Sequence, residues 1–357
     1  MTTTTPTTPA GQVPAAHLAE ARRLVDPVLR RTVDGLPPGA VRDAGRYYFG
    51  WTDADGTPAR AATGKAIRAA LVLATAEALG ADTAAALPAA AAVELVHGFT
   101  LVVDDVLDRD AVRHGRPAVW SVFGTPTALL TGNALLALGT SVLGTDPELP
   151  AAAGTLLGTT VAAMCQGADA DTAFETRDDV TMAECLTMSR QKSGIFLGAC
   201  AGLGAHAAHA APAVVEQLTE AFTTAGVAFQ YVNDLLGVWG EEARTGKRTG
   251  SDLASLKRTL VTVDALADPG PAGRELAALY SSAPPLSPER TARATELAAA
   301  TGAGQRALDA VELHTRRALE LIAQAVPDPD RRTGLEALAT MPVGYYRACA
   351  AANGPGR

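Results

Sequence analysis

The stretch ELVHGFTLVVDDVLD, residues 94–108, is the most informative part of this chain, and RDAVRHGRP continues it to Pro117. Three aspartates, Asp104, Asp105 and Asp108, end an otherwise apolar run. Asp104 and Asp108 are four residues apart, so on a helix they share one face. Carboxylates beside apolar surface are costly unless water, a cation or a basic group meets them. Mg²⁺ fits such a place, because one or two carboxylates commonly hold it together with substrate phosphates.

A nearby arginine supports a phosphate at the same place. Arg113 follows Asp108 by five residues and is a natural partner for phosphate oxygens. The stretch therefore indicates a site for a metal ion and a diphosphate. An exposed helix end with scattered charge is the alternative, and the DDxxD pattern alone does not separate the two.

The composition predicts an all-α protein. The 357 residues are 48% hydrophobic and 19% charged, which is enough apolar material for a large core. Residues that favour helices are abundant, and alternating β-branched runs are almost absent. The sequence shows no composition shift and no fixed-period repeat. We expect one helical domain over residues 16–345, between a disordered leader at residues 1–15 and a flexible tail at residues 346–357.

Charge and cysteine usage argue against several classes of protein. A net charge of −8 and the lack of a basic stripe argue against nucleic acid as a partner. The four cysteines are widely spaced, without metal-ligand spacing, and indicate a reducing compartment. No apolar run is long and clean enough to span a bilayer, and the N-terminus lacks a signal-peptide pattern. We therefore expect a cytoplasmic protein with no transmembrane segment.

Apolar spacing and breaking residues predict the helices. One helix is expected from about Ala16 to Val33, and another opens at Gly64–Lys65 and ends near Leu79. Asp82 is expected to cap the helix that carries the aspartates. Further helices are expected at about 126–143, 148–168, 181–204 and 214–239, with a break at residues 167–172.

A second acidic stretch lies about 130 residues further along the chain. Asn233, Gly237 and Glu241 are four residues apart, so we expect them on one helical face, with Asp234 beside them. Asn233 and Glu241 could both give oxygen to one ion, and Gly237 would leave space for water or a phosphate oxygen. Two such sites across a helical cavity could hold Mg²⁺ ions on one diphosphate. The metals would then act as Lewis acids, and apolar walls would keep water from a carbocation.

Basic residues stand where a diphosphate would need them. Lys65 and Arg68 are i,i+3 neighbours at an expected helix start, which favours an anion. Lys192 interrupts an apolar helix, and Lys247 and Lys257 flank the loop after the second acidic stretch. Taken singly, each fits a solvated surface charge. Together with two acidic stretches, they indicate a diphosphate site.

With these motifs in this order, the sequence resembles the polyprenyl synthetase family, the trans-isoprenyl diphosphate synthases, from about Leu24 to Ala339. It is most similar to an actinobacterial type whose second motif reads DDLLGxWG. The resemblance implies a single-domain isoprenoid synthase fold (the class I terpenoid synthase fold), which is a helical bundle around a central cavity. It also implies about three Mg²⁺ ions per active site, and a homodimer. Some of this subgroup resemble prenyltransferases packaged as cargo in encapsulin shells, and the Thr/Pro-rich leader fits that partner.

The resemblance assigns roles to the residues that match family motifs. Asp104 and Asp108, with Asp105 between them, match the Mg²⁺ ligands of the first motif, and Asn233 and Asp234 open the second. The residues that match positions gripping isopentenyl diphosphate are Lys65, Arg68 and His97, with His114 at a further such position. Arg113, Lys192 and Ser193 match positions on the allylic diphosphate. Gln230 precedes the second motif as the family pattern has it, and Lys247 and Lys257 match later lysines that face a diphosphate. Asp171 stands where the family has the aspartate of its GQxxD segment.

Several positions depart from the family pattern. Asn233 replaces the first aspartate of the second motif, so a charged ligand becomes neutral, and His114 replaces an arginine that grips isopentenyl diphosphate. The other departures are Ala66, Ala69, Val103 and Ala168. These changes around one cavity raise the question of whether turnover is ordinary.

Phe99, five positions before Asp104, would form the floor under a growing chain, which by resemblance points to geranylgeranyl diphosphate as the product. Three hypotheses follow. The first is a Mg²⁺-dependent prenyltransferase that condenses isopentenyl diphosphate with an allylic diphosphate. The second is a class I terpene cyclase, since Asn233, Asp234 and Glu241 come close to the cyclase pattern NDxxSxxxE. The third is a catalytically impaired subunit or encapsulin cargo.

Overall fold

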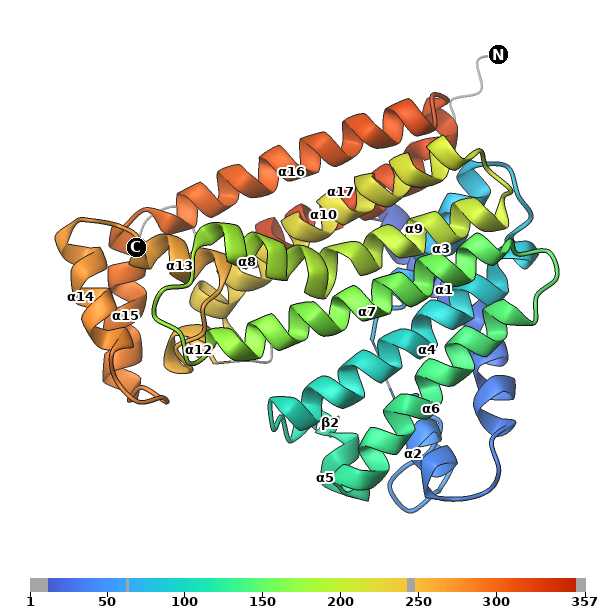
Figure 1. Cartoon of the computed structure of the whole chain (residues 1–357), viewed down its shortest axis with the longest axis horizontal. Coiled ribbons are helices and arrows are strands. Elements are labelled where there is room, and N and C mark those ends of the chain that lie inside the picture. The colour runs from blue at the N-terminus through green and yellow to red at the C-terminus, as the bar shows by residue number, and fades with distance from the viewer. Residues whose placement is uncertain (1–11, 62–63, 243–247, 351–357) are drawn as a thin grey trace, which may run out of the picture. The chain divides into compact units, whose positions relative to one another are not determined.

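The computed structural model describes residues 12–61, 64–242 and 248–350 (Figure 1). Over these residues the chain is mostly α-helical, with a short hairpin formed by β1 (Val112–Arg113) and β2 (Arg116–Pro117). The predicted all-α class is therefore confirmed. Helix extends into both terminal segments that were expected to lack it, from Gln12 at one end to Ala350 at the other. The remainder of the expected leader and tail, and Lys247, lie outside the described residues.

The chain divides into two compact units, and each is described by itself. The first unit comprises Met1–Thr159, Cys200–Glu216 and Asp328–Leu338. The second unit comprises Thr160–Ala199, Gln217–Pro327 and Ala339–Arg357. The single helical domain expected from the sequence stays a prediction.

Six of the described helices lie wholly in the first unit. They are α1 (Gln12–Asp34), α2 (Ala40–Tyr48), α3 (Ile67–Ala78), α4 (Thr83–Leu107), α5 (Val119–Phe123) and α6 (Thr125–Gly144). Helix α4 begins as predicted, because the Asp82 side chain accepts a hydrogen bond of 3.0 Å from the backbone N–H of Ala84. Residues 89–93 in its middle are completely buried, and it packs against α3 and α6. Helix α4 is thus the core helix of this unit, and it carries the first acidic motif at its C-terminal end.

Glycines set the close packing of α4 against α6. A Cβ atom at Gly139 would lie 3.0 Å from the carbonyl oxygen of Ala92, and one at Gly132 would lie 3.1 Å from Cγ2 of Val103. Such distances are too short for ordinary van der Waals contact, so the two helices are in contact along their backbones. The half-buried Phe99 also lies at this seam, with its Cδ2 3.6 Å from the position of a Cβ at residue 132.

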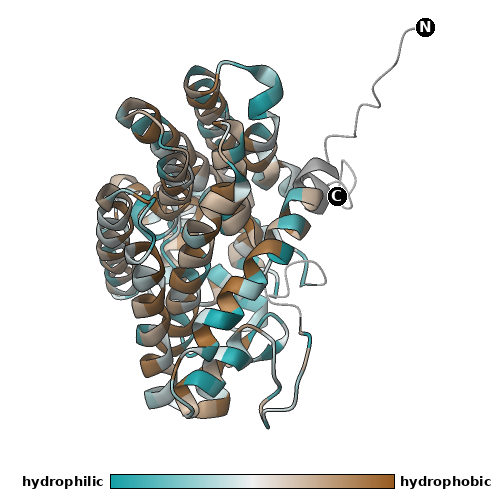
Figure 2. Cartoon of the chain, turned by 90° about the vertical axis from the view of Figure 1, so that its right-hand side faces the viewer, coloured by the Kyte–Doolittle hydropathy of each residue, from teal (hydrophilic) through white to brown (hydrophobic). Residues whose placement is uncertain are grey.

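Four of the described helices have residues in both units. They are α7 (Ala151–Phe174), α9 (Ile195–Ala207), α10 (Pro212–Trp239) and α17 (Pro329–Ala350). The remaining elements belong to the second unit. They are α8 (Met182–Ser189), the π-helical turn η1 (Arg190–Gly194), α12 (Ser251–Ala254), α13 (Leu260–Leu266), α14 (Pro271–Tyr280), α15 (Pro288–Ala300) and α16 (Ala303–Ala325). The helices carry both hydrophobic and hydrophilic residues, and several of the connecting loops are hydrophilic (Figure 2).

One helix prediction is wrong in the second unit. The break expected at residues 167–172 is absent, because α7 continues to Phe174. Gly167 serves packing instead, since a Cβ there would lie 2.5 Å from the backbone nitrogen of Lys192. The helix expected over residues 181–204 is confirmed, since α8, η1 and α9 follow one another directly, and η1 is a π-helical turn of a type that is frequent at functional sites.

Candidate active site

The first acidic motif occupies the last turn of α4. The backbone N–H of Asp108 donates a hydrogen bond of 2.8 Å to the carbonyl oxygen of Asp104, so the two carboxylates are one helical turn apart. Asp104 is half-buried and Asp108 is exposed. The C-terminus of a helix carries partial negative charge, which makes two carboxylates there unfavourable without a cation. The local electrostatics therefore call for positive charge beside Asp104 and Asp108.

Asp105 has a different partner. Its carboxylate is only 2% exposed and accepts hydrogen bonds from Nε of Arg113, at 2.8 Å, and from Nη2 of the same guanidinium. Burial raises the pKa of Asp105, and the Arg113 guanidinium opposes that shift. Asp105 was expected among the metal-binding aspartates. Its observed contact makes it the anchor that orients Arg113.

A tight hairpin presents Arg113 and His114. Both loop residues between the strands have positive φ, 52° at His114 and 75° at Gly115, as in the two-residue turns that match the strand twist. Arg116 ties the hairpin to the N-terminal part of the unit, because its guanidinium donates to the carbonyl oxygens of Tyr47, at 3.2 Å, and Thr52, at 3.0 Å. The hairpin was not predicted from the sequence, and it fixes where Arg113 and His114 lie.

Arg68 and His97 form a pair in the same unit. Nη1 of Arg68 lies 3.0 Å from Nε2 of His97. Because a guanidinium only donates, Nε2 must be unprotonated, and the proton of the neutral ring is therefore on Nδ1, 3.4 Å from Oγ1 of Thr100. Burial lowers the pKa of His97 well below its ordinary value, and the charges of Arg68, His114 and Arg113 lower it further. These four residues thus form one group of electrostatic neighbours.

The geometry expected at Lys65 is wrong in one respect. Helix α3 begins at Ile67, so Lys65 lies before the helix and not on its first turn beside Arg68. Ala66 precedes the helix in the left-handed region, with φ of 54°, which turns the chain between the two cations. Lys65 is exposed and Arg68 is half-buried.

In the second unit, η1 positions Lys192. Its Nζ lies 2.5 Å from Oδ2 of Asp171, which the continuation of α7 places on that helix. Lys192, which was expected on the allylic diphosphate, is thus paired with Asp171, which stands where the family has the aspartate of its GQxxD segment. Both side chains are partly exposed.

A chain of hydrogen bonds holds the second acidic motif. Oγ of Ser193 donates to Oε1 of Gln230 at 3.1 Å, and Nε2 of Gln230 donates to Oδ1 of Asp234 at 2.7 Å. The backbone N–H of Leu260 donates to the other carboxylate oxygen, Oδ2, at 3.0 Å. Burial and the nearby charge of Asp252 raise the pKa of Asp234 to about 7, while its two hydrogen-bond donors oppose the rise. Asp234 is 3% exposed, whereas Asn233 is exposed.

The expectation that Glu241 shares a helical face with Asn233 and Gly237 is wrong. Helix α10 ends at Trp239, and the chain has left it before Glu241. Asp252, on α12, lies in that region instead. Its carboxylate is so close to Gly237 that any Cβ at residue 237 would collide with it. Asp252 was missed from the sequence because it follows Gly237 by fifteen residues and belongs to no shared helical face.

The donor set fits a hard divalent cation. Within the described part of the chain, no group of three or more His, Cys, Asp or Glu side chains is assembled as a metal site. Mg²⁺ does not need such a group, because it commonly keeps waters and takes the rest of its ligands from substrate phosphates. Asp104 and Asp108 in the first unit, and Asn233 in the second, have the exposure such an ion requires.

Comparisons with known proteins give the family. The profile of the polyprenyl synthetase family matches residues 57–297. The chain is 40% identical over 326 residues to a geranylgeranyl diphosphate synthase of Mycobacterium tuberculosis, covering 90% of this chain and 93% of that protein. It is also 40% identical over 317 residues to a (2E,6E)-farnesyl diphosphate synthase of the same species, covering 87% and 88%.

Two solved structures agree with this result. A polyprenyl synthetase from Streptomyces coelicolor A3(2) matches with a TM-score of 0.86 and 37% identity, over 92% of this chain and 99% of that one. A polyprenyl synthase from Caulobacter crescentus CB15, complexed with calcium and isoprenyl diphosphate, matches with a TM-score of 0.78 and 25% identity, over 92% and 97%. The protein therefore belongs to the polyprenyl synthetase family.

Proposed function

We propose that this protein is a divalent-metal-dependent prenyltransferase that joins isopentenyl diphosphate to an allylic diphosphate. In this reaction the bond between C1 of the allylic substrate and its diphosphate breaks, and the diphosphate leaves with the electron pair. The double bond of isopentenyl diphosphate attacks C1, and the released diphosphate takes the proton that the new chain loses. The observation that carries the proposal is the Arg68–His97 pair beside Arg113, in the unit that also bears Asp104 and Asp108.

The first unit supplies the grip on isopentenyl diphosphate in this proposal. Arg68, Lys65 and the neutral His97 bind its oxygens, and His114 replaces a further cation there with an imidazole. Arg113, held by Asp105, is directed toward the allylic diphosphate. A second diphosphate substrate explains this concentration of cations beside an acidic motif better than a single-substrate reaction does.

The second unit carries further residues that match diphosphate-facing positions of the family. Lys192, fixed by Asp171, and Ser193, fixed by Gln230, are the direct donors, with Lys257 as a further half-buried cation. Lys247 completes this set by resemblance. Asp234, the residue after Asn233, keeps its hydrogen bonds from Gln230 and from the backbone N–H of Leu260. These two bonds hold its carboxylate in a fixed position.

The metal is proposed to be Mg²⁺, with about three ions per active site. Divalent-metal dependence is supported by the calcium and isoprenyl diphosphate in the Caulobacter structure. Asp104, Asp108 and Asn233 would hold the ions, with Asp252, whose carboxylate lies against Gly237, in place of the expected Glu241. When bound, such ions neutralise the leaving diphosphate as a Lewis acid.

A terpene cyclase is the alternative, and one observation weakens it. The cyclase pattern needs Asn233, Gly237 and Glu241 on one helical face, but α10 ends before Glu241. The Arg68–His97 pair also has no role in a reaction without isopentenyl diphosphate. A catalytically impaired subunit or encapsulin cargo stays a prediction, since the leader on which the shell partner rests lies mostly outside the described residues.

The product is proposed to be geranylgeranyl diphosphate. The support is the bulk of Phe99, one turn before the acidic motif, where it packs beside Gly132. The two M. tuberculosis relatives carry the names of geranylgeranyl and farnesyl diphosphate synthases at equal identity, so the named relatives do not choose between these lengths.

A homodimer is proposed from the surface of α6. This helix contains no charged residue, and Leu129 and Leu130 on it are 38% and 58% exposed. Two described helices, α4 and α6, are long and apolar enough to cross a membrane by length and composition alone. Of their most apolar windows, 56% of α4 but only 33% of α6 is buried. A second copy of the chain would cover α6 in a soluble, cytoplasmic protein.

The test is to incubate the purified protein and Mg²⁺ with dimethylallyl, geranyl, farnesyl or geranylgeranyl diphosphate, each with and without isopentenyl diphosphate, and to identify products by mass. Longer diphosphates formed only with isopentenyl diphosphate are the expected result. Hydrocarbon or terpene alcohol formed without isopentenyl diphosphate would mean that cyclisation, and not elongation, is the main reaction. No product in any mixture would favour the impaired subunit.

A further inference from the structure

Arg258 is buried in the second unit, between the end of α12 and the start of α13. Its side chain is 8% exposed and lies over the ring of Tyr280, with Cζ 4.6 Å from the ring centroid. Burying a guanidinium costs several kcal/mol of desolvation, and an apolar side chain of similar size would often pack as well. Packing alone therefore does not explain why an arginine stands at position 258, and its hydrogen bonds are expected to have a role.

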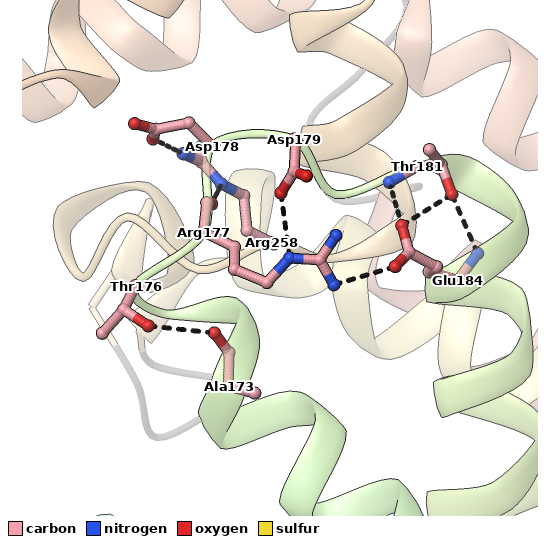
Figure 3. A network of polar contacts seen from close by, with 8 residues as sticks. All are labelled: Ala173, Thr176, Arg177, Asp178, Asp179, Thr181, Glu184 and Arg258. Carbon is pink, nitrogen blue, oxygen red and sulfur yellow. Dashed lines mark hydrogen bonds and ion pairs between the residues drawn. The ribbon is translucent and has the colours of Figure 1, made fainter.

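The guanidinium joins two segments that are distant in sequence. Nε donates to the carbonyl oxygen of Arg177 at 3.0 Å, and Nη2 donates to Oδ1 of Asp178 at 2.7 Å (Figure 3). Both partners lie in the loop between α7 and α8. A planar fork with fixed donor directions can reach a carbonyl and a carboxylate at once, whereas a lysine ammonium cannot reproduce this geometry.

The loop that receives Arg258 is itself ordered. Arg177 lies between Asp179, at 2.9 Å from Nε, and Glu184, at 2.8 Å from Nη1 (Figure 3). Glu184 and Thr181 complete a capping box at the start of α8. This loop directly follows the end of α7, the helix on which Asp171 holds Lys192.

The turn that carries Arg258 meets the second acidic motif. The backbone N–H of Leu260, two residues on, is the donor to Oδ2 of Asp234. The neighbouring Lys257 has its N–H bound to the carbonyl oxygen of Asp252, at 2.9 Å. A shift of this turn would therefore move a hydrogen-bond donor of Asp234 and the segment that bears Asp252.

We propose that Arg258 is a positioning residue of the second acidic site, because it locks the turn that serves Asp234 and Asp252 to the loop that follows Asp171. The proposal deepens the proposed function and rests on it. Arg258 contacts neither substrate nor metal in this view. It acts through the Leu260 N–H, and its loss would leave the carboxylates in place but loosely held.

The experiment measures binding and not turnover. Mg²⁺ with inorganic diphosphate is titrated by calorimetry into the full chain, as wild type, Arg258→Met, Arg258→Lys and Arg258→Ala. Loss of partners that orient ligating groups typically weakens metal affinity roughly 10- to 100-fold, and Arg258→Met is expected to fall in that range. Added guanidinium should restore part of the affinity in Arg258→Ala, since it can fill the vacated site.

The matched control is Arg293→Met. Arg293 forms a well-aligned ion pair with Glu275, at 2.8 Å from Nε, but on the surface, where its side chain is 49% exposed. The affinity of the Arg293→Met variant for Mg²⁺ with diphosphate should equal that of the wild type. Circular dichroism and a melting curve establish that each variant is folded at the titration temperature, and Arg258→Lys provides a milder change if Arg258→Met is not.

The outcomes separate the two proposals. A folded Arg258→Met or Arg258→Lys that binds like the wild type overturns the positioning role and leaves the proposed function standing. A wild type that binds no magnesium diphosphate overturns the proposed function, and the positioning role falls with it. A melting temperature that falls without any change in affinity would mean that Arg258 serves stability alone.

Discussion

The Asp252 carboxylate occupies the space that a side chain at Gly237 would need. Gly237 lies on α10, one turn after Asn233, and Asp252 comes from the short helix α12. The absence of a side chain on one helix therefore admits a carboxylate from another. The second acidic site is consequently assembled from two segments. The charge of Asp252 adds to the effect of burial and raises the pKa of Asp234.

Gly237→Ala tests this relationship. Alanine is the better helix former by about 1 kcal/mol, but its Cβ would collide with Asp252, and such overpacking costs about 1–3 kcal/mol. We expect a lower melting temperature and weaker Mg²⁺ binding. Gly344→Ala is the control, because no atom lies within 4 Å of its Cβ position. A melting temperature that rises equally in both variants would contradict the close contact.

Asn233→Asp should strengthen metal binding. Asn233 is exposed beside the buried Asp234, and a charged ligand holds Mg²⁺ more tightly than a neutral amide does. We expect a roughly tenfold lower Mg²⁺ concentration for half-maximal activity, since charge count tunes affinity at such sites. The measurement is product formation over a magnesium titration. Loss of activity would instead mark Asn233 as suited to another reaction.

His114→Arg should tighten the grip on isopentenyl diphosphate. A guanidinium adds charge-assisted hydrogen bonds to phosphate, and we expect the KM for isopentenyl diphosphate to fall about tenfold with little change in kcat. The loop position has φ of 52°, which histidine and asparagine accept more readily than arginine. His114→Asn is therefore the control for backbone strain, and it should raise the KM. An unchanged KM in His114→Arg would remove this residue from the binding site.

His97 should make stability depend on pH. Its pKa in the folded protein is well below the ordinary value of 6.5, so below that pH the unfolded chain binds more protons than the folded one. Stability is therefore fully present above about pH 6.5 and is lost as the pH falls, at up to about 1.4 kcal/mol per pH unit.

His97→Gln keeps an acceptor for Arg68 but removes the titrating group. The difference in unfolding free energy between wild type and variant, from urea titrations at several pH values, should shrink or reverse as the pH falls below 6.5. A difference that stays constant with pH would mean that His97 does not titrate between the two states.

Leu130→Glu should disrupt the proposed dimer. Leu130 is 58% exposed on the uncharged helix α6, so two buried glutamates would face an apolar interface. Sedimentation should show a monomer or a strongly weakened dimer. Leu313→Glu is the control, since Leu313 is 60% exposed on α16 and lies outside the proposed interface. Equal sedimentation of wild type and Leu130→Glu would place the interface elsewhere.

Much of the fold could be predicted from local sequence. The start of α4 was predicted correctly, because the Asp82 cap acts on the next turn and needs nothing distant. The spacing of Asp104 and Asp108 likewise placed both carboxylates one turn apart on the same helix. The prediction at Gly167 was wrong because the sequence alone does not distinguish a glycine that ends a helix from a glycine within a helix that lets a neighbouring backbone pack closely.

The sequence by itself determined the all-α class, the family and the residue types of both acidic motifs, since these depend on composition and short spacing. The tertiary structure decided the partners. Arg113 binds Asp105, the Asp252 carboxylate lies against Gly237, and Arg258 ties its turn to the loop after α7. Such contacts join residues that short-range periodicity does not relate, so only the packed chain, in which buried charges must find partners, could reveal them.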